Sequence, residues 1–131
     1  MAQGNVDRFL EAANAFNRRD LDAWLAAYSE DCVFESRVAP MEGASRGHHG
    51  VAAFLRNIDE TFEVFEVQFD DVRDLGDRVL ALGSVRNIGK GSGLEMSGPL
   101  AIIARFEGGR ITHFKDFDDR ERALEAAGLS E

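Results

Sequence analysis

The segment Arg78–Asp118 reads RVLALGSVRNIGKGSGLEMSGPLAIIARFEGGRITHFKDFD. It contains three stretches rich in strand-forming residues, separated by glycine-containing turns at 89–93 and 107–110. Because successive side chains of a strand point to opposite faces, we expect the even-numbered residues to share one face. These are Leu80, Leu82, Ser84, Arg86, Ile88, Met96, Leu100, Ile102, Ala104, Phe106, Phe114, Asp116 and Asp118. The face is mainly apolar, so its charged residues are expected to be paired or functional.

Segments on both sides of this one show helical periodicity. Apolar residues recur every three or four positions in 5–18 and again in 51–58, which predicts two amphipathic helices. Between them, Asp20 is expected to cap a short helix that carries Tyr28. A closing helix is predicted at 119–127, ended by Gly128.

The remaining stretches are expected to be strands and a loop. Short strands are predicted at 32–38 and 62–72, and a loop at 39–50, which contains Pro40 and three glycines. Gly83 and Gly98 lie within predicted strands and would let the sheet bend.

Together these elements predict one α+β domain over 1–131, a curved antiparallel sheet packed by three N-terminal helices, with a short C-terminal helix. A bent sheet closed by helices makes a cone-shaped α+β barrel. The open question is whether side chains fill the cone or leave a pocket.

Composition limits the class of protein. The chain has 131 residues and a net charge of −9, from 24 acidic and 15 basic residues. This balance argues against nucleic acid and anionic membranes as partners, since both favour basic patches. The single cysteine, Cys32, excludes an internal disulfide, and no signal-peptide or membrane-span pattern is found. We therefore expect a cytoplasmic protein.

Several motifs indicate ordinary structure rather than chemistry. The stretch GKGSG at 89–93 lacks the spacing of a phosphate-binding loop and is expected to be a turn. His48 and His49 are neighbours at a predicted helix start, so their side chains diverge, and we expect no metal site. Cys32 is expected to be a buried thiol.

Four aromatic residues lie at core spacing and leave two interpretations open, packing in the core or contact with a ligand. They are Trp24, Tyr28, Phe34 and Phe54. Tyr28 differs from the others because a buried hydroxyl group needs a hydrogen-bond partner.

The element order and three stretches resemble the nuclear-transport-factor-2-like superfamily, especially its SnoaL-like polyketide cyclase branch. The stretches are FNRRDLDAWLAAYSEDCVFE (16–35), RGHHGVAAFLR (46–56) and RFEGGRITHFKDFDDRERALEAAGL (105–129). The resemblance implies a conical pocket that binds a small molecule, and a homodimer formed through the outer face of the sheet. The outer face is expected to carry Val79, Ala81, Val85, Ala101 and Ile103, an apolar surface consistent with that dimer.

The enzymes of this superfamily match the chain unevenly. Where ketosteroid isomerases have their catalytic base and two oxyanion donors, this chain has Ser36, Ala12 and Ile102, so that mechanism is not expected. Limonene epoxide hydrolases are similar in the last strand, where Asp116 matches a catalytic aspartate.

Their other catalytic positions are replaced. The Arg-x-Asp pair of those hydrolases corresponds to Ser84-x-Arg86 here, and their tyrosine and asparagine correspond to Phe34 and Ser36.

These observations lead to a hypothesis of acid/base catalysis without metal or organic cofactor. Asp116 would be the general acid/base, Arg86 its charge partner across the sheet, and Tyr28 a hydrogen-bond donor. The expected pocket residues are Phe16, Trp24, Phe34, Ser36, Phe54, Leu82, Ser84, Leu100, Ile102, Phe114 and Asp118. The substrate would be an apolar metabolite, cyclic compounds included, and the reaction an isomerisation, cyclisation, epoxide hydrolysis or dehydration. The alternative is a non-catalytic ligand-binding or dimeric interaction domain with a structural Arg86–Asp116 pair.

Overall fold

The computed structural model describes residues 4–37 and 43–129. Its elements in chain order are α1 (Asn5–Arg18), α2 (Leu21–Ala26), β1 (Tyr28–Ser36), β2 (Gly43–Arg46), α3 (Gly47–Thr61), β3 (Phe62–Asp74), β4 (Arg78–Gly89), β5 (Glu95–Glu107), β6 (Arg110–Phe117) and α4 (Arg120–Ala126). These strands form one sheet in the order β2-β1-β6-β5-β4-β3. Neighbouring strands are antiparallel except β1 and β6, which are parallel. The α+β prediction is confirmed, with one parallel pair in a sheet expected to be antiparallel throughout.

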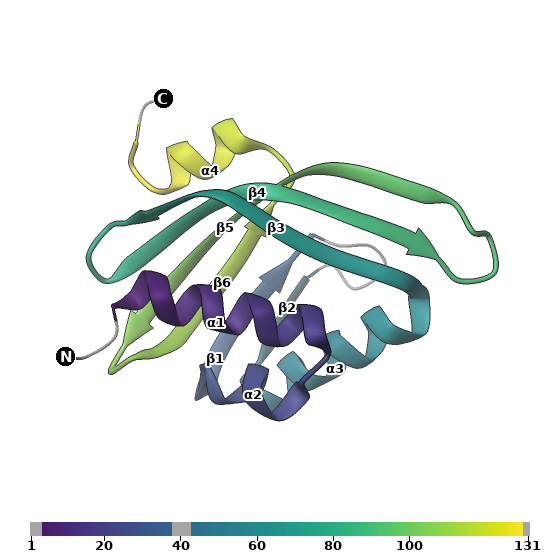
Figure 1. Ribbon diagram of the computed structural model, residues 1–131. Helices are drawn as coiled ribbons and strands as arrows, with labels where there is room; N and C mark the ends of the chain where they lie inside the picture. The colour runs from purple at the N-terminus through teal and green to yellow at the C-terminus, as the bar shows by residue number, and fades with distance from the viewer. Residues whose placement is uncertain (1–3, 38–42, 130–131) are drawn as a thin grey trace.

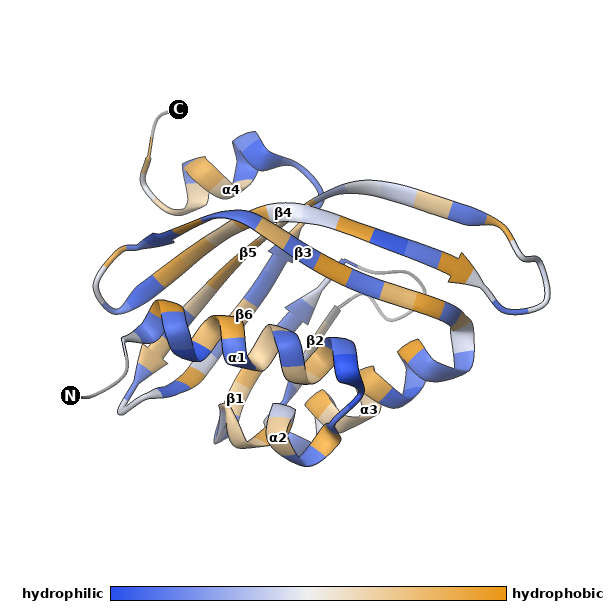
Figure 2. Cartoon of the chain, in the orientation of Figure 1, coloured by the Kyte–Doolittle hydropathy of each residue, from blue (hydrophilic) through white to orange (hydrophobic). Residues whose placement is uncertain are grey.

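The helices cover both faces of the curved sheet. Figure 1 shows α1, α2 and α3 beneath the concave face, while α4 lies on the opposite face. Along β3 and around α1, hydrophobic and hydrophilic residues alternate (Figure 2), because each element has one side toward the interior and one toward solvent. The predicted arrangement of three N-terminal helices and a short closing helix is therefore confirmed.

Each helix has a local cause in the sequence. The apolar stripe of α1 buries Phe9 and Phe16. The Asp20 side chain accepts a hydrogen bond from the backbone N–H of Ala23, which caps α2. The Asp119 side chain caps α4 in the same way.

Two hydrophobic cores result, one on each side of the sheet. The inner core lies between the concave face and α1–α3, and includes Phe65, Ala81 and Ile102. The outer core lies under α4, and its members are Leu80, Leu82, Ala101, Phe117, Ala123, Leu124 and Ala127. The closing helix thus covers an apolar part of the outer face that would otherwise meet solvent.

The register of β4 against β5 overturns one sequence prediction. Leu80 is opposite Ile103, and Ala81 is opposite Ile102. Even-numbered residues of β4 therefore share a face with odd-numbered residues of β5, so the predicted even face does not continue across this hairpin. Its turn sets the register, and a shift of one residue exchanges the two faces.

A bulge in β3 accounts for part of the curvature. The pairing of β3 with β4 shifts between Phe69 and Asp71, next to Gly83. A side chain at Gly83 would lie 2.7 Å from the Phe69 Cα atom and 2.8 Å from the Gln68 carbonyl carbon, too close for any residue but glycine. The predicted role of this glycine in bending the sheet is consistent with that geometry.

Two element boundaries differ from the sequence prediction. Tyr28 begins β1 rather than ending the second helix, which stops at Ala26. The predicted loop 39–50 contains strand β2 and the start of α3, since Gly43–Arg46 pairs with β1. The rest of that loop, and the end of the strand predicted at 32–38, lie outside the described residues.

Candidate functional site

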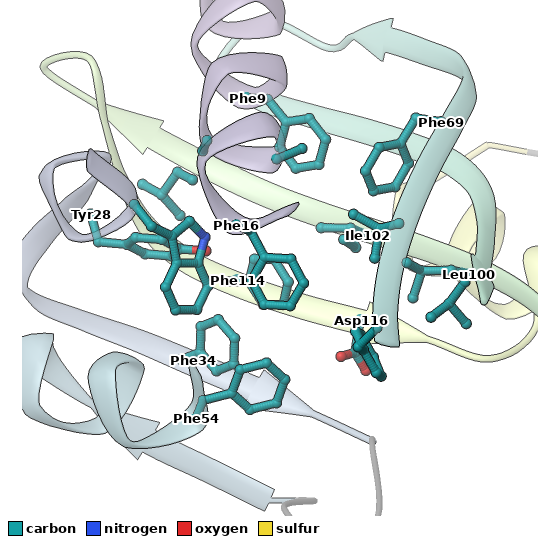
Figure 3. A pocket seen from close by; sticks show the side chains of 17 residues that line it. Phe9, Phe16, Tyr28, Phe34, Phe54, Phe69, Leu100, Ile102, Phe114 and Asp116 are labelled. Carbon is teal, nitrogen blue, oxygen red and sulfur yellow. The ribbon is translucent and has the colours of Figure 1, made fainter. Parts of the chain in front are cut away.

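The concave face of the sheet and the helices enclose an apolar cavity (Figure 3). Its lining residues are Phe9, Ala12, Ala13, Phe16, Trp24, Tyr28, Phe34, Phe54, Phe65, Val67, Phe69, Val85, Leu100, Ile102, Ile111, Phe114 and Asp116. The centre of a water-sized sphere can move through a volume of about 80 Å³ inside the cavity. This volume counts only the positions of sphere centres, so the space that the atoms of a ligand can fill is larger.

Aromatic rings make up much of this wall. Phe34 and Phe114 stack with ring centroids 4.3 Å apart and planes 4° from parallel. The stack follows from the parallel pairing of β1 with β6, which sets these two residues opposite each other. Phe54 from α3 and Trp24 from α2 pack around the Phe34 ring.

Asp116 provides the single carboxyl group among the described lining residues. Its side chain is buried, and each carboxyl oxygen accepts one hydrogen bond. Ser36 Oγ donates to Oδ2 at 2.7 Å, and the backbone N–H of Arg37 donates to Oδ1 at 2.8 Å. These two donors from the end of β1 fix the plane of the carboxyl group.

Opposing effects act on the pKa of Asp116. Burial away from water raises it, while the hydrogen bonds from Ser36 and from the Arg37 N–H, together with the nearby Arg37 guanidinium, lower it. Asp118 adds a small upward effect, and the net shift is upward from the ordinary aspartate value. Asp116 is therefore a stronger base when ionised than a solvent-exposed aspartate.

Tyr28 is the second residue with a titratable group in the cavity wall, and it is almost fully buried. Burial raises the pKa of its hydroxyl group well above the ordinary tyrosine value, and Cys32 and Asp116 act in the same direction. The Trp24 side chain, whose ring centroid lies 5.3 Å from that of Tyr28, acts in the opposite direction. Tyr28 thus stays protonated, and it reaches the cavity from the start of β1 rather than from a helix as predicted.

Arg86 does not lie near Asp116, and the predicted pairing is wrong. Arg86 is on the outer side of β4, opposite Ser97 of β5. Its guanidinium is half-exposed and forms ion pairs with Glu95 at 2.8 Å and Glu66 at 3.5 Å. The error follows from the register of the β4–β5 hairpin, which places Val85 rather than Arg86 in the cavity wall.

Three other predicted pocket residues lie elsewhere. Leu82 belongs to the outer core, and Ser84 is exposed on the same outer side of β4. Asp118 is exposed, with its carboxylate 3.7 Å from Arg37 Nε. Asp119, not Asp118, caps the last helix.

The other expected pocket residues lie in or next to the cavity. Phe16, Trp24, Phe34, Phe54, Leu100, Ile102 and Phe114 are in its wall. Ser36 is buried behind Asp116 as its hydrogen-bond donor.

Several lining residues were missed in the sequence. Phe65, Val67 and Phe69 come from β3, whose alternating pattern predicted a strand without showing which side faces the helices. Val85 could have been found only with the register of β4. Ala12 and Ala13 are small residues of α1 that the apolar stripe alone does not distinguish from core positions.

The outer face gives less support for a homodimer than the sequence suggested. Val79, Ala81 and Val85 pack inside rather than on that face. Ala101 and Ile103 do face outward, but they pack in the core under α4. The five residues therefore do not form the exposed apolar surface on which the homodimer was predicted, and the homodimer stays a prediction.

The described residues contain no group of three or more His, Cys, Asp or Glu side chains placed to hold a metal ion. Cys32 is buried, and burial raises the pKa of its thiol, as expected of a structural rather than a reactive cysteine. Among the helices in residues 4–37 and 43–129, none is both long and apolar enough to cross a membrane.

The sequence matches a family described as the SnoaL-like domain over residues 6–114. The chain belongs to the SnoaL-like domain family. No functionally curated protein matches this SnoaL-like chain. The family assignment confirms the resemblance inferred from the sequence.

Solved structures with the same fold support this assignment. An NTF2-like protein of unknown function from Burkholderia pseudomallei is 26% identical, with a TM-score of 0.83 over 95% of this chain and 97% of that one. TerC, crystallised with polyporic acid, is 19% identical with a TM-score of 0.80 over 95% and 98% of the two chains. An LEH-like epoxide hydrolase from M. tuberculosis is 23% identical with a TM-score of 0.74 over 94% and 88%. The last two likenesses establish a shared fold.

Proposed function

We propose that this SnoaL-like domain is an acid/base enzyme that transfers a proton on a small apolar molecule, with Asp116 as the acid/base. The observation that carries the proposal is a buried carboxyl group, held at both oxygens, in the wall of an otherwise apolar cavity. Perturbed titratable groups in such cavities are characteristic of catalytic sites. The reaction belongs to the isomerase, cyclase or epoxide-hydrolase/dehydratase type.

The arrangement supports a specific role for each contact. In the basic form, the carboxylate of Asp116 accepts a proton from a substrate carbon or water, and the resulting carboxylic acid returns it to another position. The donors Ser36 and Arg37 hold the carboxyl group in one orientation during both steps. Since Tyr28 stays protonated, Asp116 is the described lining residue that can both accept and donate a proton.

The alternative of a non-catalytic domain loses part of its basis. It assumed a structural pair between Arg86 and Asp116, and Arg86 instead pairs with Glu66 and Glu95 on the outer side of the sheet. None of the described lining residues is a cation that could neutralise Asp116. Its upward pKa shift is a cost that a purely structural site has no need to carry.

The test uses cyclohexanone in D₂O, because exchange of its hydrogens next to the carbonyl is the simplest proton transfer that such a site can catalyse. Protein-dependent exchange, followed by proton NMR, is expected for the wild type. Asp116→Asn should lower the rate by roughly 10²–10⁴-fold. Hydrolysis of cyclohexene oxide, measured in parallel, separates proton transfer at carbon from activation of water.

Asp118→Asn is the matched control, since it removes an exposed carboxylate two positions away and should keep the activity. Exchange that continues unchanged in Asp116→Asn would remove Asp116 from the mechanism. Binding of cyclohexanone without exchange or epoxide hydrolysis would instead support a non-catalytic binding domain.

A further inference from the structure

Gly98 lies inside strand β5, where a glycine costs stability unless something requires it. Its backbone conformation does not require glycine, because Gly98 does not have the positive φ seen at other glycines of the chain. Packing does not require it either, since a Cβ atom at Gly98 would meet no atom of the described residues within 4 Å. Gly83 differs, because the backbone of β3 leaves it no room for a side chain. What the glycine at position 98 provides is open space.

This open space adjoins the cavity. Gly98 is directly opposite Val85 in the pairing of β4 with β5, so the two positions point to the same face of the sheet. Leu100, two positions further along β5, points to that face as well. Val85 and Leu100 both line the cavity, and the Cβ positions of opposite residues are about 5 Å apart. The space over Gly98 therefore begins beside the cavity wall.

The same face continues along β5 from the cavity to solvent. The pairing of β5 with β6 reaches only as far as Ala101 and Phe117, so among the described residues 95–100 have a neighbouring strand on the β4 side alone. Figure 1 shows this end of the β4–β5 hairpin projecting beyond the rest of the sheet. Met96, the next residue on the cavity face after Gly98, is 58% exposed. We call the strip formed by Leu100, Gly98 and Met96 the β5 path.

The β5 path leads toward Asp116. Asp116 is opposite Ile102, and Ile102 is four positions from Gly98 along β5, roughly 13 Å of strand. Figure 3 shows Leu100, which lies between them, at the same end of the cavity as Asp116. A molecule that contacts both Asp116 and Gly98 is therefore elongated.

The chemistry of the path indicates what part of a molecule it can hold. Gly98 and Met96 carry no charge, and neither do the residues opposite them, Val85 and Asn87. A charged group placed there would lose water without gaining an ionic partner. An apolar chain loses nothing and buries its surface.

We propose that the β5 path is a subsite for an apolar tail of the substrate, which makes the substrate class elongated molecules. The part that exchanges a proton lies at Asp116, and the tail passes over Leu100 and Gly98 toward Met96. Gly98 is then a specificity-determining residue, because a larger side chain would occupy the space of the tail. This inference rests on the proposed function, since it names the substrate class for the same site.

Two methyl ketones test the path, butanone and 2-decanone, which share the carbonyl end and differ in the length of the alkyl chain. One ¹H–¹⁵N NMR spectrum reports on both parts of the site. The indole N–H of Trp24, the single tryptophan of the chain, reports on the cavity wall, and the backbone N–H of Gly98 reports on the path. We expect both ketones to shift the Trp24 resonance and only 2-decanone to shift that of Gly98. A 2-decanone titration that leaves the Gly98 resonance in place would overturn the proposal.

Gly98→Val fills the path with a side chain that suits a strand. The wild type should bind 2-decanone at least roughly 10²-fold more tightly than butanone, because the longer chain buries more apolar surface. Gly98→Val should reduce this preference by roughly 10-fold or more while its affinity for butanone stays within about 2-fold of the wild type. Unchanged butanone binding also shows that the cavity of the variant is intact.

Ser97→Val is the matched control. It adds the same side chain one position away on the outer side of the sheet, opposite Arg86, and should leave both affinities unchanged. Equal weakening of both ketones in Gly98→Val would overturn the subsite, and so would a 2-decanone preference as large as that of the wild type.

The outcome is separate from that of the proposed function, since these titrations measure binding without turnover. Exchange of the hydrogens next to the 2-decanone carbonyl in D₂O is followed in parallel. Loss of the 2-decanone preference in Gly98→Val, together with an absence of exchange in the wild type, would support the subsite and reject the acid/base role. Exchange that depends on Asp116 while Gly98→Val binds 2-decanone as the wild type does would support the acid/base role and reject the subsite.

Discussion

Ser36 donates a hydrogen bond to Asp116 over 2.7 Å although 80 positions separate them in the chain. The parallel pairing of β1 with β6 brings them together, because it sets Phe34 opposite Phe114 and the next inward-facing residues are Ser36 and Asp116. This strand pair therefore builds both the aromatic wall and the polar end of the cavity.

Replacing Ser36 by alanine should raise the pKa of Asp116 further. The Ser36 hydroxyl group stabilises the charged carboxylate, and it is the largest effect that opposes burial. A ¹³C NMR titration of the Asp116 carboxyl carbon measures the change directly. Ser84→Ala is the control, because Ser84 is exposed on the outer side of β4. The same Asp116 pKa in the wild type, Ser36→Ala and Ser84→Ala would contradict the effect assigned to the Ser36 hydroxyl group.

Asp116→Asn should stabilise the protein at neutral pH. A raised carboxyl pKa means that the folded state binds the proton more tightly than the unfolded chain. This tighter proton binding stabilises the folded protein fully at pH values below the ordinary aspartate pKa of 3.8. The stabilisation is lost as the pH rises through the raised pKa of Asp116 in the folded state.

The melting temperature of Asp116→Asn should therefore exceed that of the wild type at pH 7, and the gap should close below about pH 3.5. Thermal unfolding followed by circular dichroism at both pH values gives the comparison. A variant less stable at pH 7 would show that the hydrogen bonds from Ser36 and Arg37 outweigh the cost of burial.

Arg86→Gln should leave the titration of Asp116 unchanged, since Arg86 contacts Glu66 and Glu95 on the other side of the sheet. Arg37→Gln is the informative comparison. The Arg37 guanidinium lowers the pKa of Asp116, so its removal should raise that pKa while the backbone N–H still donates to Oδ1. An effect of Arg86→Gln as large as that of Arg37→Gln would contradict the observed face of Arg86.

The sequence supports the fold better than the site for a physical reason. Helix α1 and strand β6 have local periodicity that fixes which residues are buried, and both were predicted from it. Whether Arg86 and Asp116 share a face depends on the register between two strands, which the turn at 89–93 sets and the alternation alone does not show. Asp116 was correctly predicted on the cavity side because even-numbered residues of β5 are opposite even-numbered residues of β6, as Ile102 is opposite Asp116.

The contacts of Asp116 were harder to predict than its position. Ser36 was identified as a pocket residue, but its hydrogen bond depends on β1 lying parallel to β6, a pairing that no local pattern indicates. Arg37 donates its hydrogen bond to Asp116 through the backbone N–H, and its residue type gives no signal of that contact.

Gly83→Ala should destabilise the protein by roughly 1–3 kcal/mol or more, because the added carbon would overlap the backbone of β3 at Gln68 and Phe69. Gly98→Ala is the matched control in the facing strand, where an added carbon meets no atom within 4 Å. It should be neutral or stabilising by up to about 1 kcal/mol. Urea unfolding of both variants tests whether the bulge requires glycine, and equal stabilities would show that it does not.

Asn17→Ala should loosen the contact between α1 and the edge strand β3. The Asn17 side chain pairs with the Val67 backbone in both directions, donating to its carbonyl oxygen at 2.9 Å and accepting from its N–H at 3.0 Å. Val67 is also in the cavity wall, so these bonds hold one side of the pocket.

Asn14→Ala makes the same change on an exposed part of α1 and gains the same helix propensity. The difference between the two free energies of unfolding therefore isolates the hydrogen bonds, and we expect Asn17→Ala to be less stable by about 1–3 kcal/mol. Faster hydrogen exchange at the Val67 amide in Asn17→Ala alone would locate the change, whereas equal stabilities would show that water replaces both bonds without cost.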